Sequence, residues 1–228
     1  MVLANGITIE VNQHSYPDLY FALRGGGNNF GIVTRFDLET FPQGNMWGGM
    51  RFYSLTANVS ILTALDNFVN NAPSDPDAAL IVAFALYKGY YSTSTDIEYA
   101  KPVVNPPIFN ELMSINSLSS TMRVTNLTDL TKELNATNPG GFRELYTTAT
   151  FRSSAMLPSK ILDIFVAEIE EIKGAEGILP ALIFQPITRN VIAQFSKNGG
   201  NALGIEESDG PLIRRCSSIS AWILTSFC

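Results

Sequence analysis

The chain has 228 residues, of which 46% are hydrophobic and 11% aromatic, and this is enough apolar material for one large or two small domains. Its 15 Lys and Arg residues against 21 Asp and Glu residues give a net charge of -6, with no basic run that could neutralise a phosphate backbone. No apolar run reaches the roughly 18 residues that span a bilayer, and no charged-then-apolar leader opens the chain. These features argue against nucleic acid and membranes as partners.

The start of the chain predicts a hairpin, a short helix and a strand. Ala4-Asn5-Gly6 separates apolar runs, and Asn-Gly is the strongest two-residue signal for a hairpin. Ser15 is expected to cap a helix from Asp18 to about Arg24, which the following glycines end. From Gly31 apolar and polar residues alternate, and this alternation predicts a strand with one buried face.

The segment Phe41-Pro42-Gln43-Gly44-Asn45 is rich in residues that break regular structure, and we predict a domain boundary there. Beyond it strands and helices are mixed without a strict βαβ rhythm, which indicates an α+β fold. The expected strands are Trp47–Tyr53, Leu80–Tyr87, Tyr90–Tyr99, Glu144–Arg152 and Leu179–Ile187. The expected helices are Asn58–Asn71, Ile108–Met113, Leu127–Ala136, Ser159–Lys173 and a short one ending near Lys197. The Ser-rich tail from Arg214 fits neither period well.

Side chains that could bind a metal or act as nucleophiles are few. The two cysteines, Cys216 and Cys228, have neither metal-ligand spacing nor a disulfide framework, so we predict no metal site. The single histidine, His14, is expected to be exposed beside the short helix. Three sequons mildly favour secretion of a full-length parent and leave the localisation open; they begin at Asn58, Asn126 and Asn135.

The glycine cluster from Gly25 to Gly31 is not a nucleotide-binding motif of a common type. It lacks the Lys-Ser/Thr pair of a Walker loop and the glycine offsets of a Rossmann fingerprint, and it runs from helix to strand. A helix C-terminus also offers no dipole that favours an anion. On the glycines alone a tight turn is favoured, while a close backbone approach to a cofactor stays open.

Polar side chains on the last expected strands could line a substrate cleft. Gln185 shares a strand face with Ala181 and Ile183, and a buried amide there either bonds to backbone or points into a polar pocket. Tyr146 and Arg152 lie on one polar face of another strand. A polar strand face is more often exposed to solvent than part of a substrate cleft.

The segment PDLYFALRGGGNNFGIVTRFDLETFP, residues 17–42, closely resembles the end of the PCMH-type flavin-binding domain of FAD-linked oxidases. These oxidases form the vanillyl-alcohol-oxidase superfamily, and the likeness is to its fungal berberine-bridge-enzyme-like group. Four later segments are similar to the substrate domain of that group: DIEYAKPVVNPPIFNELMSI, NPGGFRELYTTATF, LPALIFQPIT and FSKNGGNALGIEESDGPLI. The likeness covers about residues 2 to 213.

The resemblance implies roles for residues of both regions. In the family the segment matching Phe30-Gly31-Ile32-Val33 runs beside the FAD, and backbone groups there contact its adenosine-diphosphate part. The antiparallel sheet of the substrate domain covers the isoalloxazine, so Gln185 is the preferred substrate-side residue, with Tyr146 and Arg152 as weaker candidates. The residues implied in cofactor binding are Gly25, Gly26, Gly27, Asn29, Phe30, Gly31, Ile32 and Val33.

The resemblance also implies an incomplete chain. The Gly-Gly-His loop that cradles the pyrophosphate in the family is absent, as is the C-terminal Asn-Tyr-type motif. We therefore expect residues 1–42 to be the end of the FAD-binding domain, 43–213 a substrate domain with an antiparallel sheet covered by helices, and 214–228 an aberrant tail. The implied function is oxidation of a hydroxyl-bearing small molecule by hydride transfer to FAD, with oxygen as acceptor. The alternative is a non-catalytic truncated product that binds no FAD.

Overall fold

The computed structural model describes residues 1–137, 142–175 and 177–222, and these residues form two compact units. The first unit combines Met1–Pro42 with Arg189–Gly210. The second combines Gln43–Thr188 with the described residues from Pro211 onward. The predicted boundary near Phe41–Asn45 thus falls at the junction of the units, but the first unit also takes in a segment far along the chain.

The second unit is built on an antiparallel sheet of eight strands within the described residues. The strand order is β4-β1-β3-β2-β7-β8-β6, and β5 pairs with β1 beside this path. The strands are β1 (Met46–Ser54), β2 (Ala78–Tyr87), β3 (Tyr90–Tyr99), β4 (Ser119–Ser120), β5 (Arg123–Thr125), β6 (Phe142–Arg152), β7 (Leu179–Ile187) and β8 (Leu212–Trp222). Lys88 and Gly89 join β2 to β3 with φ values of +50° and +82°, as a tight hairpin turn of the primed type requires.

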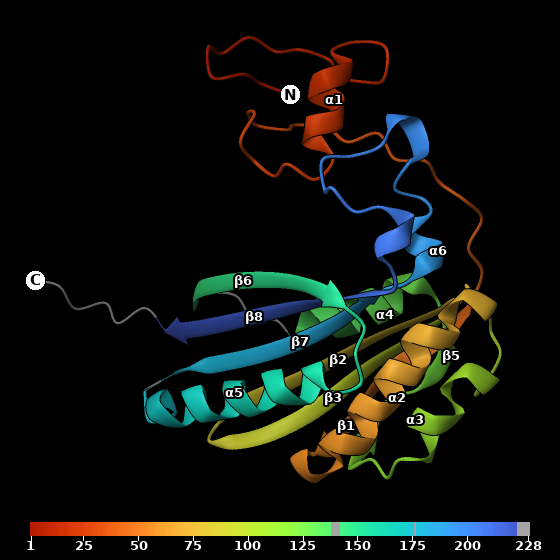
Figure 1. Cartoon of the computed structure of the whole chain (residues 1–228), viewed down its shortest axis with the longest axis vertical. Coiled ribbons are helices and arrows are strands. Elements are labelled where there is room, and N and C mark those ends of the chain that lie inside the picture. The colour runs from red at the N-terminus through yellow and green to blue at the C-terminus, as the bar shows by residue number, and fades with distance from the viewer. Residues whose placement is uncertain (138–141, 176, 223–228) are drawn as a thin grey trace, which may run out of the picture. The chain divides into compact units, whose positions relative to one another are not determined.

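Helices cover one face of this sheet and bury its core. The core cluster includes side chains of α2 (Asn58–Asn71), α3 (Asn110–Ser114) and α5 (Leu157–Ile172), and Figure 1 shows α2 and α5 on the same side of the strands. Phe84 of β2 and Phe184 of β7 meet edge to face in this layer, with ring centroids 6.1 Å apart. Helix α4 (Leu127–Ala136) packs on the other face, where Leu130 lies close to Gly48.

Most regular elements of this unit confirm the predictions with small changes at their ends, whereas the short strands β4 and β5 were not predicted. The bounds of α2 and α4 are those expected, because each helix has an apolar stripe at helical spacing. The α+β class is confirmed as well. Strand β8 differs from the expectation, since the segment from Arg214 to Trp222 pairs with β7 and β6. The remainder of the predicted tail lies outside the described residues.

The first unit has little regular structure. Its α-helices are α1 (Pro17–Leu23) and α6 (Arg189–Ile192). The Leu3 N–H donates to the Ile7 carbonyl oxygen and closes the predicted Asn-Gly hairpin. The guanidinium of Arg24 donates to the carbonyl oxygens of Lys197 and Asn198 at 3.0 and 2.7 Å. These bonds link the two chain segments of the unit.

Two predictions for this unit are wrong, and a third misplaces a helix end, since α6 ends at Ile192 and not near Lys197. Ser15 does not cap α1, because Tyr16 occupies the cap position and the Ser15 hydroxyl donates to the Glu10 carbonyl instead. The strand expected from Gly31 does not form: Ile32 makes a single bridge with Val2, and the following residues have no regular structure. A strand needs a ladder partner, and the Ile32 side chain, 71% exposed, has no core to enter.

Candidate functional site

The glycine cluster forms a tight turn in which contacts within its own unit require Gly25, Gly26 and Gly31. A Cβ atom on Gly31 would lie 2.4 Å from the Val2 carbonyl oxygen, and one on Gly26 would lie 2.4 Å from that of Ala22. A Cβ atom on Gly25 would press on Leu203. The turn interpretation therefore accounts for these glycines through close packing of the chain on itself.

In the segment from Gly31 to Val33 that follows this turn, every second backbone N–H group lacks a hydrogen-bond acceptor within the described residues. Ile32 donates its N–H to the Val2 carbonyl and accepts from the Val2 N–H, at 2.9 and 2.8 Å. The N–H groups of Gly31 and Val33 have no hydrogen-bond partner among the described residues. Gly27, Asn29 and Phe30 are exposed in the turn. Free amides of this kind can bind an anionic group, so Gly31 and Val33 fit the phosphate part of a flavin cofactor better than Ile32 does.

The second candidate region is the sheet face that α2 and α5 do not cover. Cross-strand partners point to the same side of a sheet, so the register decides which side chains share a face. Gln185 pairs with Arg214, and Arg214 pairs with Thr150. By the same alternation Tyr146 and Arg152 lie on this face, as the sequence predicts, although their roles remain predictions.

Residues that pair in register across neighbouring strands form a row that runs across this face, and Gln185 belongs to one such row. Its side-chain oxygen accepts a hydrogen bond of 2.5 Å from the Arg214 guanidinium. The pairing of Val82 with Phe184 places Gln185 level with Ile81, and Ile81 pairs with Asp96. Tyr146 is four residues along its strand from this row, about 13 Å away at the usual rise per residue, so the structure does not bring it beside Gln185.

Carboxyl groups gather on the β3 side of the same face. Burial, together with the negative charges of Glu98 and Glu133, raises the pKa of Asp96 to about 7. Burial also raises the pKa of Glu98. Arg123 is bound to Asp129 and Glu133, which lowers the pKa of Asp129. Sequence reasoning missed Asp96, because its neighbours become visible only once the strands are paired.

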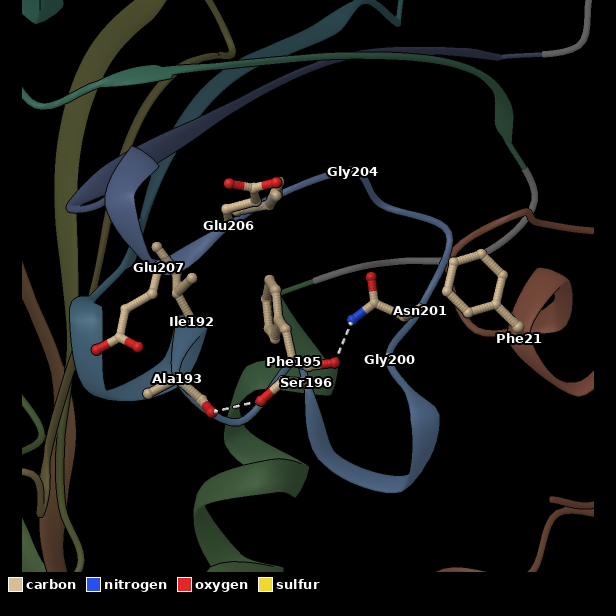
Figure 2. A pocket seen from close by; sticks show the side chains of 11 residues that line it. Phe21, Ile192, Ala193, Phe195, Ser196, Gly200, Asn201, Gly204, Glu206 and Glu207 are labelled. Carbon is tan, nitrogen blue, oxygen red and sulfur yellow. Dashed lines mark hydrogen bonds between the residues drawn. The ribbon is translucent and has the colours of Figure 1, made fainter.

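A pocket of about 380 Å³ lies within the first unit (Figure 2). Phe21 and Phe195 contribute apolar surface, and the Asn201 amide donates to the Phe195 carbonyl oxygen at 3.1 Å. Its charged lining residues are Glu206 and Glu207, and Glu206 caps the short turn that follows it. The lining contains no Lys or Arg, so this pocket is unsuited to a pyrophosphate.

Two kinds of feature are absent from the part of the chain that the structure describes. No group of three or more His, Cys, Asp and Glu side chains within it could hold a metal ion. No helix among these residues is long and apolar enough to cross a membrane. His14 is exposed, as expected.

Comparison of the sequence with known proteins gives relatives over nearly the whole chain. FAD-dependent monooxygenase FUP4 of Fusarium proliferatum is 40% identical over 226 residues, and the match covers 93% of this chain and 44% of the relative. FAD-dependent monooxygenase tpcD of Cochliobolus heterostrophus is 38% identical with the same coverage. Both relatives are fungal FAD-dependent monooxygenases by name. The chain spans less than half the length of these two relatives. No protein-family model matches the chain.

Solved structures of FAD-linked oxidases share the fold. The 6-hydroxy-D-nicotine oxidase of Arthrobacter nicotinovorans has a TM-score of 0.67 at 18% identity, covering 98% of this chain and 48% of the oxidase. The glucooligosaccharide oxidase of Acremonium strictum has a TM-score of 0.64 at 14% identity, covering 97% and 47%. The chain therefore has the fold of about half of a berberine-bridge-enzyme-like oxidase.

Proposed function

We propose that the chain supplies part of an FAD-dependent oxidoreductase. The enzyme would oxidise a hydroxyl-bearing small molecule by hydride transfer to the flavin, with molecular oxygen as the acceptor. The observation that most strongly supports an FAD-dependent oxidoreductase is the 40% identity, across 93% of the chain, to a protein named as an FAD-dependent monooxygenase. Bound FAD would supply the redox chemistry, and the protein would supply position and polarity.

The two units would contribute different groups. In the first, the open amides of Gly31 and Val33 would hold the adenosine-diphosphate part of FAD. In the second, Gln185 would bind the substrate, because its amide lies on the sheet face free of α2 and α5 and is oriented by Arg214. Thr150 lies in the same row as Gln185, and Arg152 lies one row away.

Flavin binding by the purified chain is the direct test of this proposal. We expect added FAD to remain with the protein through desalting and to titrate with a saturable change in its visible absorbance. ADP should compete, while riboflavin, which lacks the diphosphate, should compete poorly. A chain that is folded by circular dichroism but retains no flavin would contradict the proposal and support the alternative, a non-catalytic product.

Replacing Val33 with proline should weaken FAD binding about tenfold or more. Proline removes the backbone N–H, and a hydrogen bond to a charged group contributes about 1.5–3 kcal/mol. The same change at Phe36, which is exposed in the same irregular segment, serves as the matched control and should leave the Kd for FAD unchanged. Equal weakening by Val33→Pro and Phe36→Pro would mean that the amide of Val33 does not contact the cofactor.

A further inference from the structure

Asp96 belongs to the row of residues that contains Gln185. It pairs with Ile81 of β2, and Ile81 is level with Gln185 of β7. Since neighbouring strands are about 4.8 Å apart, the backbones of Asp96 and Gln185 are about 10 Å apart across this face. A small molecule lying on the face could therefore reach both side chains.

The side chains around this gap are small or aliphatic. Ala79 and Ala83 flank Ile81 on the same face of β2, because residues two apart on a strand point the same way. Because alanine side chains are short, they leave space above the sheet on either side of Ile81. The row thus presents a carboxyl at one end, an amide at the other and shallow apolar surface between them, as a hydroxyl-bearing substrate would require.

The charged groups that face Asp96 are acidic. Glu98 is on its own strand and Glu133 is on α4, and both act on Asp96 through their negative charges. Its partners in register, Met50 on β1 and Ile81 on β2, are uncharged. Arg123 on β5 is the cation of this cluster, and it forms ion pairs with Asp129 and Glu133.

This arrangement lets Asp96 change protonation near neutral pH. In the described part of the chain the Asp96 carboxyl has no hydrogen-bond or ion-pair partner, and burial together with the charges of Glu98 and Glu133 raises its pKa to about 7. A general base works best when its pKa lies near the working pH, because it is then both ionised and able to hold a proton. An ordinary, solvated Asp would be too weak a base for that role.

We propose that Asp96 accepts the hydroxyl proton when the substrate is oxidised, an inference that rests on the proposed function. The substrate C–H bond breaks and its hydrogen leaves with the electron pair, as hydride, to the flavin. The O–H bond breaks and the proton goes to a carboxylate oxygen of Asp96, while the carbon–oxygen double bond of the product forms. Gln185 would hold the substrate oxygen. Molecular oxygen, accepting the electron pair with two protons, would return the flavin to its oxidised state as hydrogen peroxide forms.

The test compares the flavin-loaded chain with Asp96→Asn and with the control Glu98→Gln. Glu98 lies on the same strand and face, one row away. Substrates from a panel of hydroxyl compounds are mixed with each protein without oxygen, and the rate of flavin bleaching is followed from about pH 5 to about pH 9. We expect Asp96→Asn to lower this rate by about 100-fold or more and to abolish its rise near pH 7, as loss of a general base does. Glu98→Gln should keep the rise of the bleaching rate with pH and move it slightly to lower pH, because it removes a negative charge that raises the pKa of Asp96.

A second measurement does not depend on turnover. Carboxyl carbon NMR should give Asp96 a pKa near 7 in the chain without flavin, and this signal should be missing in Asp96→Asn. An Asp96 pKa near 4, or flavin bleaching in Asp96→Asn with unchanged rate and pH profile, would overturn the role of Asp96 alone. A chain that binds no flavin would overturn the proposed function, and the role of Asp96 with it.

Discussion

Replacing Phe184 with alanine should lower the free energy of unfolding of the sheet unit by about 3–5 kcal/mol. The Phe184 side chain is 0% exposed and packs edge to face on Phe84. Its loss removes buried apolar area and leaves a cavity where β7 joins β2, because a close-packed core collapses only in part. Urea unfolding followed by the fluorescence of the buried Trp47 measures this change.

The control for Phe184 is Phe36, an equally large side chain that is 73% exposed. Phe36→Ala should change the stability by less than about 0.5 kcal/mol, since it removes no core contact. Gln185 follows Phe184 and points to the opposite face, so Phe184→Ala should also weaken substrate binding through a looser strand. A loss of stability below about 1 kcal/mol would show that Phe184 does not anchor the core.

The stability of the sheet unit should depend on pH through Asp96. Its pKa is raised from 3.8 to about 7 in the folded chain, so the folded state holds a proton that the unfolded state has released. The stabilisation by this proton is fully present below about pH 4 and is lost as the pH rises through about 7. The difference in pKa corresponds to at most about 4 kcal/mol, and less where water reaches the carboxyl.

Asp96→Asn removes this contribution, while carboxyl groups that do not interact with Asp96 titrate equally in both proteins. At about pH 8 the variant should be more stable than the parent by about 2–4 kcal/mol, and the difference should vanish near pH 4. Glu98, whose pKa burial also raises, would add a dependence of the same sign, which cancels only in part because its charge acts on Asp96. Unfolding curves for both proteins at a series of pH values test this, and a difference that does not change with pH would contradict it.

The sequence alone determined the elements whose residue pattern is local and strongly periodic. The helices Asn58–Asn71 and Leu127–Ala136 were predictable to the residue, because an apolar stripe at helical spacing needs only one surface to pack on. The hairpin of β2 and β3 was predictable from its strand patterns. The family resemblance likewise lay in a local run of residues, and the homologues agree with it.

Tertiary structure decided what depends on a partner distant in the chain. The segment after Gly31 alternates like a strand but forms none in the described chain, because a strand is stabilised by a ladder that it cannot provide itself. Strand β8 forms through its pairing with β6 and β7, in spite of a weak pattern. Asp96 was an ordinary acidic residue in the sequence. Its place in the row of Gln185 and its raised pKa follow from strand register and burial, which only the folded sheet provides.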